Sequence, residues 1–79
     1  MINVEKHLDK YYQLALNISY YRKKKGLSQI ELAEKANISR THLSKIEAPN
    51  VLQAFSLNIL FEIAEALEIE PMKLFDFTK

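Results

Sequence analysis

Residues 28–47 read SQIELAEKANISRTHLSKIE and contain two short helical patterns joined through Ala-Asn-Ile. Each pattern opens with a serine, Ser28 or Ser39, and a serine side chain can accept a hydrogen bond from the first turn of a helix. Glu31 follows Ser28 by three residues and completes a capping box. A connection this short keeps the two helices adjacent, so the stretch predicts two packed helices with a tight corner between them.

The corner and the underside of the second helix are built from small and apolar residues. Ala33 lets the two helix backbones approach closely, and Asn37 tolerates a positive φ better than most residues. Ile38 fills the corner, while Leu43 and Ile46, three residues apart, anchor the second helix from beneath. The second helix is therefore expected to be held by this side alone.

The other side of the second helix gathers groups that can reach, donate and accept hydrogen bonds: Arg40, Thr41, His42, Ser44 and Lys45. A helix held by one face that presents polar groups on the other can enter a DNA major groove. There arginine reads guanine O6 and N7, and the Thr41 methyl can meet a thymine methyl. Ordinary solvated charge is the alternative reading. Since no second histidine or carboxylate stands at ligand spacing from His42, we expect no metal site and no cofactor.

The N-terminal part of the chain also follows a helical pattern. We expect a first helix from about Val4 or Asp9 to Lys25, with an inward stripe at Tyr11, Leu14, Ile18 and Tyr21. The four tyrosines at helical spacing are read as core and rim residues, with base stacking as the less favoured alternative. Gly26, the only glycine, follows a cationic last turn and is expected in the left-handed conformation.

The C-terminal part predicts two more helices. Pro49 stops the second helix of the opening stretch, and residues 48–55, APNVLQAF, form a loop. Ser56 opens a helix whose inward stripe is Leu57, Leu60, Ile63, Ala64 and Leu67, and Pro71 opens a last short helix, MKLF. The prediction is an all-α, compact five-helix bundle in a single domain, 1–79, in which residues 1–13 are an N-terminal extension of the first helix.

The charge is unevenly distributed along the 79 residues, whose net charge is +1. Residues 20–45 hold seven cations against two carboxylates, whereas residues 46–79 hold two cations against six. A basic segment of this kind suggests a polyanionic partner for one face. The chain has no cysteine, no apolar run long enough for a membrane span and no secretory signal pattern, so we expect the cytoplasm and no membrane contact.

The span RKKKGLSQIELAEKANISRTHLSKIE, residues 22–47, resembles the Cro/phage-repressor (XRE-type) helix-turn-helix family. The motif S-Q-x-x-L-A, a turn, an I-S cap and L-S-x-I-E occur together at that family's spacing. The segment SLNILFEIAEALEIEPMKLF resembles the last helices of that family, so the resemblance covers about residues 14–75.

The resemblance implies a sequence-specific DNA-binding protein, usually dimeric on a palindromic operator in double-stranded DNA. Arg40, Thr41 and Lys45 occupy the family's base-reading positions, flanked by His42 and Ser44. Gln29 resembles the glutamine that bonds a phosphate, and further phosphate contacts are expected from Arg22, Lys23, Ser39 and Asn50. Arg22 and Glu47 stand where the family often has an ion pair.

Two positions depart from the family's pattern. Asn37 stands where the family often has glycine, and Glu47-Ala48-Pro49-Asn50 replaces the common Glu-x-Gly. The loop that follows is unusually apolar. Exposed apolar residues usually mark an interface, so we expect a two-fold dimer through residues 48–56 and the last two helices, with Val51, Leu52, Phe55 and Phe75 in the contact. Phe77 belongs to the same patch, and the alternative is that residues 1–13 cover it.

These residues favour one class of function over two others. The leading hypothesis is a stand-alone transcriptional regulator that acts as a homodimer. The alternative is an antitoxin or other partner-binding module that uses the apolar 48–56 loop to bind a small protein, with DNA binding secondary. An enzyme is not expected, because the chain offers no cysteine, no Ser-His-Asp set, no glycine-rich phosphate loop and no carboxylate pair in a pocket.

Overall fold

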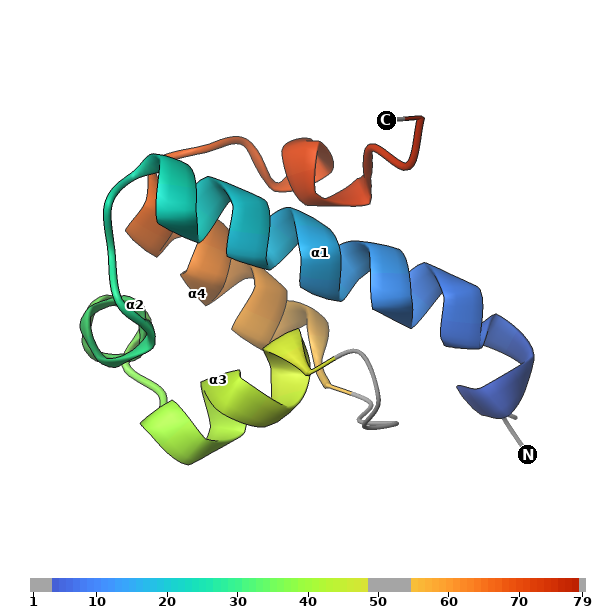
Figure 1. The fold of residues 1–79 in the computed structure, drawn as a ribbon, viewed down its shortest axis with the longest axis horizontal. Helices are drawn as coiled ribbons and strands as arrows, with labels where there is room; N and C mark the ends of the chain where they lie inside the picture. The colour runs from blue at the N-terminus through green and yellow to red at the C-terminus, as the bar shows by residue number, and fades with distance from the viewer. Residues whose placement is uncertain (1–3, 49–54, 79) are drawn as a thin grey trace.

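The computed structural model describes residues 4–48 and 55–78, with side chains from Lys6 onward. Four α-helices, α1 (Leu8–Lys24), α2 (Gln29–Ala36), α3 (Arg40–Glu47) and α4 (Leu57–Leu67), are flanked by the 3₁₀ helices η1 (Val4–His7) and η2 (Pro71–Phe75). Figure 1 shows α4 and η2 on opposite sides of α1, and α1 is in contact with both. The described residues contain no strand, and the all-α prediction is confirmed.

The predicted count of five α-helices is wrong, because the last segment forms the 3₁₀ helix η2. Pro71 has no N–H to donate, and the chain becomes extended at Asp76, where ψ is 99°. Only five residues fit between these points. Its bonds have the shorter 3₁₀ spacing, with the Lys73 N–H donating to the Glu70 carbonyl at 2.9 Å.

Serine side chains cap three of the four α-helices as the sequence predicts. Ser28 Oγ accepts from the Glu31 N–H at 3.1 Å, and the Glu31 carboxylate accepts from the Ser28 N–H at 2.8 Å. Ser39 Oγ accepts from the His42 N–H at 3.0 Å, and Ser56 caps α4 in the same way. The helix boundaries are therefore set by local chemistry, and α1 ends at Lys24, one residue before the predicted end.

Residues in the left-handed region form the connections between helices. Gly26 follows α1 with φ of 76°, and Asn37 follows α2 with φ of 59°, both as predicted. Glu68 ends α4 with φ of 58°, which the sequence does not predict, because glutamate has no particular preference for this region. At the corner after α2, the Ile38 N–H donates to the Ala33 carbonyl at 3.0 Å, so the turn keeps its backbone groups paired.

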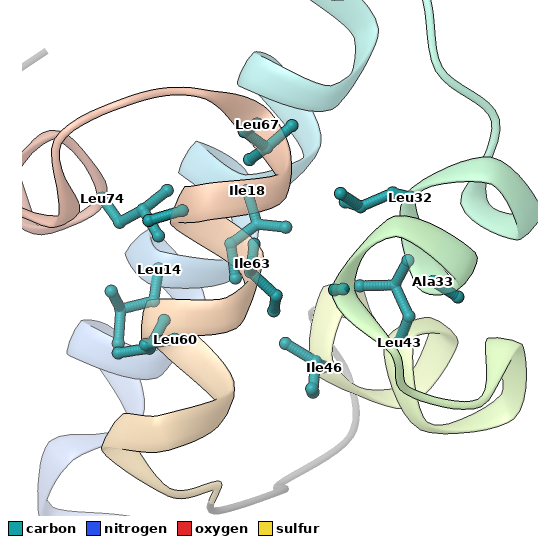
Figure 2. Close-up of a cluster of buried hydrophobic side chains, with 12 residues drawn as sticks. Leu14, Ile18, Leu32, Ala33, Leu43, Ile46, Leu60, Ile63, Leu67 and Leu74 are labelled. Carbon is teal, nitrogen blue, oxygen red and sulfur yellow. The ribbon is translucent and has the colours of Figure 1, made fainter.

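Aliphatic side chains from α1, α2, α3, α4 and η2 form one core (Figure 2). Its members are Leu14, Ile18, Leu32, Ala33, Ala36, Leu43, Ile46, Leu60, Ile63, Ala64, Leu67 and Leu74. Tyr11 and Tyr21 are half-buried against this core. Leu57 was predicted to face inward, but its side chain is 61% exposed, because it is the first residue of α4 and lies beyond the point where Leu60 closes the core.

Asn17 is the one buried polar residue among those described, and it fixes the C-terminal segment to α1. Its Nδ2 donates to the Leu74 carbonyl at 2.9 Å and to the Asp76 carbonyl at 3.0 Å. The two bonds satisfy the amide inside the protein, where an unpaired polar group would cost free energy. They hold η2 in place, so Leu74 can enter the core.

Candidate nucleic-acid interface

The polar side of α3 is presented outward because its other side is buried. Leu43 is fully buried and Ile46 is 3% exposed, whereas Arg40, Thr41 and Lys45 are exposed to solvent. His42 and Ser44, the two flanking positions of the predicted reading surface, are half-buried. The structure therefore places all five predicted base-reading residues on one short helix, and three of them are exposed.

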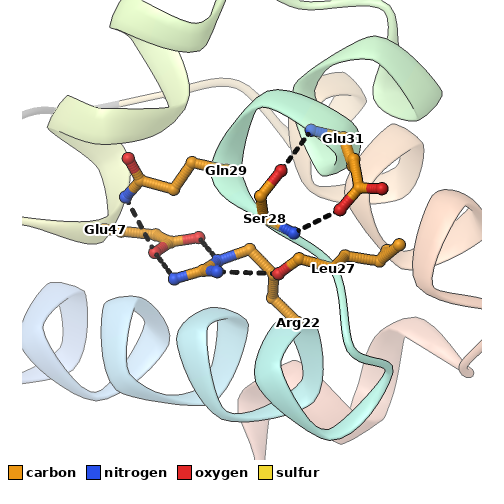
Figure 3. Close-up of polar contacts among 6 residues, drawn as sticks. All are labelled: Arg22, Leu27, Ser28, Gln29, Glu31 and Glu47. Carbon is orange, nitrogen blue, oxygen red and sulfur yellow. Dashed lines mark hydrogen bonds and ion pairs between the residues drawn. The ribbon is translucent and has the colours of Figure 1, made fainter.

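Arg22 and Glu47 form the ion pair that the sequence predicts. Arg22 Nε lies 2.8 Å from Glu47 Oε2, and Nη2 donates to Oε1 at 3.0 Å (Figure 3). Nη1 donates to the Leu27 carbonyl at 2.8 Å. The two side chains are only 12% and 5% exposed, so the contact is largely shielded from water. Arg22 therefore links α1 to the loop before α2 and to the end of α3.

Gln29 joins the same carboxylate. Its Nε2 donates to Glu47 Oε1 at 3.1 Å, so one oxygen of Glu47 accepts from both Arg22 and Gln29. Gln29 is also the first residue of α2, where backbone N–H groups lack acceptors within the helix and favour an anion. The Glu47 carboxylate therefore orients the Gln29 amide beside the start of α2. No local pattern in the sequence indicates this contact.

Ser39 and Lys23 are also predicted to contact phosphate, and they differ in the contacts that they make within the protein. Ser39 Oγ accepts the capping bond of α3, which leaves its O–H to donate elsewhere. Lys23 is exposed and has no hydrogen-bond or ionic partner among the described residues. Asn50, the remaining predicted phosphate ligand, lies outside the described residues.

The three consecutive lysines at the end of α1, Lys23 to Lys25, make different contacts. Lys24 Nζ lies 5.7 Å above the centre of the Tyr20 ring, a cation–π contact on the helix surface. Lys25 forms an ion pair with Glu68, and this pair lowers the pKa of the Glu68 carboxyl below its ordinary value. Lys23 is therefore the member of the run that is least engaged within the described part of the protein.

The predicted apolar patch is partly described. Val51 and Leu52 lie outside the described residues, whereas Phe75 and Phe77 are 44% and 36% exposed. The Tyr11 ring meets the half-buried Phe55 edge to face, with centroids 5.9 Å apart, so the N-terminal part covers some of the patch. What stays open is an apolar groove of about 460 Å³, whose lining also includes His7, Lys10, Leu14, Leu57 and Leu60.

Two other kinds of site are absent from the described residues. Histidine and acidic side chains nowhere gather in a group of three that could hold a metal ion within residues 4–48 and 55–78. In the same part of the chain no helix combines the length and the apolar character that a membrane crossing requires. The polar face of α3 and the network behind it are thus the most developed site that the structure describes.

Two short helices at a tight corner, the second with one buried and one polar face, define a helix-turn-helix domain. Residues 18–74 match the profile of the helix-turn-helix family, and the chain belongs to its Cro/phage-repressor (XRE-type) group. The resemblance that the sequence carries is thereby confirmed.

Two bacterial regulators are similar to this chain in sequence. The HTH-type transcriptional regulators SinR and SlrR of Bacillus subtilis (strain 168) are 39% and 41% identical to it over 59 residues, or 75% of this chain. That match spans 52% of SinR and 38% of SlrR, so the chain corresponds to about half or less of each relative.

Two solved structures share the fold. The restriction-modification controller protein C.AhdI from Aeromonas hydrophila is 31% identical with a TM-score of 0.77, covering 82% of this chain and 96% of that chain. The hypothetical transcription factor NHTF from Neisseria is 28% identical with a TM-score of 0.78, covering 95% of this chain and 80% of that chain. Both similarities extend well beyond the helix-turn-helix itself.

Proposed function

We propose that this protein is a sequence-specific DNA-binding transcriptional regulator that places α3 in the major groove. The observation that carries the proposal is the division of α3 into two faces, with Leu43 and Ile46 buried and Arg40, Thr41 and Lys45 exposed. The Arg22–Glu47 pair ties the far end of α3 to α1, so the reading face is held at a fixed angle. Rigid presentation of this kind is what base readout requires.

The side chains on α3 have separate roles in this proposal. Arg40, at the first position of the helix, reads guanine through two hydrogen bonds, and Thr41 offers a methyl group to thymine. Lys45 follows Arg40 by five residues and reaches a base edge or phosphate further along the groove. His42 and Ser44 are less exposed and border the reading face, where they adjust its shape and supply single hydrogen bonds.

The phosphate contacts lie around this helix. Gln29 donates one amide hydrogen to Glu47 and has a second for a phosphate beside the start of α2. Lys23 and the Ser39 hydroxyl add a charge and a donor, and Asn50 is proposed as a further ligand. Arg22 contributes mainly by holding Glu47, because its guanidinium is mostly buried and bonds the carboxylate at two points.

The comparisons support a regulator over the other classes. SinR and SlrR are named as transcriptional regulators, and C.AhdI is named as a restriction-modification controller. The chain covers nearly all of C.AhdI but only part of SinR and SlrR. Control of transcription is therefore the function we assign.

We further propose a homodimer, in which the groove beside Phe55 and Phe75 receives a second copy. Both side chains line an apolar hollow that opens to solvent, the kind of surface that marks an interface. A two-fold dimer would set two α3 helices about 34 Å apart, one turn of DNA. The same groove also suits a small protein partner, which is the alternative function, and sedimentation of the free chain as a monomer at high concentration would favour that alternative.

The proposal is tested by selecting sites from a random duplex library at about 150 mM salt, where non-specific binding is weak. Wild type, Arg40→Ala and a control, Lys73→Ala on η2, are compared. We expect wild type and the control to select one palindrome with half-sites about 10 bp apart, and Arg40→Ala to lose discrimination at one position in each half. Recovery of no motif by wild type would reject sequence-specific binding.

A further inference from the structure

The outer face of α1 carries a row of large apolar side chains that the core does not use. Leu8, Tyr12, Leu16 and Tyr20 follow one another every four residues and are 46%, 42%, 43% and 49% exposed. Side chains at this spacing form a continuous ridge on a helix. Because Ile18 and its neighbours fill the core from the opposite side of α1, the ridge faces away from the described fold.

The ridge is also separate from the groove assigned above to a dimer. The part of α1 that lines the groove is Lys10, Tyr11 and Leu14, and none of the four ridge residues takes part in it. Ridge and groove therefore lie on different sides of the same helix. Whatever contacts the ridge need not compete with a partner in the groove.

Charges beside the ridge are arranged so that α1 complements a reversed copy of itself. Asp9 lies in the first turn, next to Leu8, while its neighbour Lys10 lines the groove on the other side of the helix. Lys23 and Lys24 lie in the last turn, beyond Tyr20. Two such helices side by side in the same direction would place like charges together. In opposite directions, Asp9 of each copy lies near Lys23 of the other.

We propose that the ridge is a contact between two copies of this chain, with their α1 helices antiparallel and Leu16 on the two-fold axis. In this register Tyr12 packs against Tyr20 of the second copy, and Asp9 pairs with Lys23 of the second copy. Each contact occurs twice, as an isologous interface requires. Antiparallel helices joined by rows at four-residue spacing pack with axes 8–10 Å apart, as in other proteins.

The size of the ridge sets the strength of the contact. A stable interface uses about 20–30 residues a side, and this ridge offers four large side chains and the charges at its ends. Self-association through α1 is therefore weak in dilute solution. The inference does not depend on DNA binding, and its test is made on the free chain.

Cysteine substitution tests the register directly, because the natural chain has no cysteine. Leu16→Cys, treated with a thiol oxidant, is expected to give a disulfide-linked dimer. Ile30→Cys on α2, at a site that is 56% exposed, serves as the control for random collision. Equal dimer yields from the two variants would overturn the proposal.

Mixing two further variants separates antiparallel from parallel packing. Tyr12→Cys and Tyr20→Cys are each expected to cross-link poorly alone, since like positions then lie about 12 Å apart along the axis, too far for a disulfide. Their mixture is expected to form the heterodimer in high yield. Cross-linking of either variant alone to the level of the mixture would reject the antiparallel arrangement.

Charge reversal provides a second measurement without any cysteine. Asp9→Lys is expected to raise the dissociation constant for self-association roughly threefold to tenfold, because two exposed pairs become repulsive. Asp9→Lys combined with Lys23→Asp is expected to restore it. Sedimentation equilibrium of the free chain measures both, with Phe75→Glu present in every variant to block the groove. A double variant no tighter than the single one would contradict the pairing.

Discussion

Arg22 and Glu47 meet in a two-point ion pair, Nε to Oε2 at 2.8 Å and Nη2 to Oε1 at 3.0 Å, that joins the last turn of α1 to the last residue of α3. The same carboxylate also accepts from Gln29 at the first residue of α2. One side chain therefore sets the relative positions of three helices. The orientation of the proposed reading face depends on it.

Removal of one member of this pair is expected to destabilise the fold strongly. Glu47→Ala leaves a mostly buried guanidinium without its counter-ion, which we expect to lower the free energy of unfolding by about 3 kcal/mol. The double variant Arg22→Met, Glu47→Leu buries no charge and should lose clearly less. Urea denaturation of both variants measures the difference. A double variant as unstable as Glu47→Ala would mean that packing matters more than charge pairing.

The hydrogen bonds of Asn17 are expected to stabilise the C-terminal segment. Asn17→Ala removes the donor for the Leu74 and Asp76 carbonyls, and we expect about 2 kcal/mol of lost stability from these unpaired groups. Limited proteolysis should then cut near η2 faster than in wild type. Gln13→Ala, a polar change elsewhere on α1, is the control. An unchanged cleavage rate in Asn17→Ala would show that Leu74 alone holds the segment.

The left-handed backbone conformation of Asn37, at the corner of the helix-turn-helix, is expected to affect thermal stability. Asn37 has φ of 59°, a conformation that costs a residue with a Cβ about 1 kcal/mol or more relative to glycine, and asparagine less than most. Asn37→Ala should therefore unfold at a temperature several degrees lower than Asn37→Gly, by about 4–8 °C for a domain of this size. Calorimetry of the two variants decides this, and equal midpoints would mean that the corner carries no such strain.

The capping box of α2 makes stability depend on pH. Hydrogen bonds from the Ser28 backbone N–H and side chain, followed by the charge of Lys35, lower the pKa of the Glu31 carboxyl below its ordinary value of 4.5. The carboxylate is thus favoured by folding, so its contribution is complete above that pH and is lost as the pH falls through the lowered pKa. Thermal melts of wild type and Glu31→Gln from pH 7 to pH 3 should converge at the acidic end. A constant difference would assign the effect to another group.

Features set by neighbouring residues could be predicted from the sequence. The caps at Ser28, Ser39 and Ser56 and the positive φ of Asn37 each follow from the chemistry of a few adjacent positions. The Arg22–Glu47 pair was available only through the resemblance to a family. Its members are too far apart in the chain for any local pattern to connect them.

Features that depend on tertiary placement could not be predicted in the same way. Asn17 bonds carbonyls 57 and 59 positions away, and nothing in its own surroundings indicates this. Leu57 fits the apolar spacing of α4, but spacing does not say where a core ends. The roles of Arg40, Thr41 and Lys45 stay predictions, because an exposed side chain shows where contact can occur and its position alone does not identify the base.

The two helices of the motif have eight residues each. Helices of this length are barely populated outside a folded protein, so the proposed reading face exists only while the whole domain is folded. An operator would then act as a ligand of the native state alone, adding about 2.7 kcal/mol to stability when its free concentration is a hundred times the dissociation constant. Copies bound to their sites would resist proteases that digest unbound copies, and the lifetime of such a regulator would follow its occupancy of DNA.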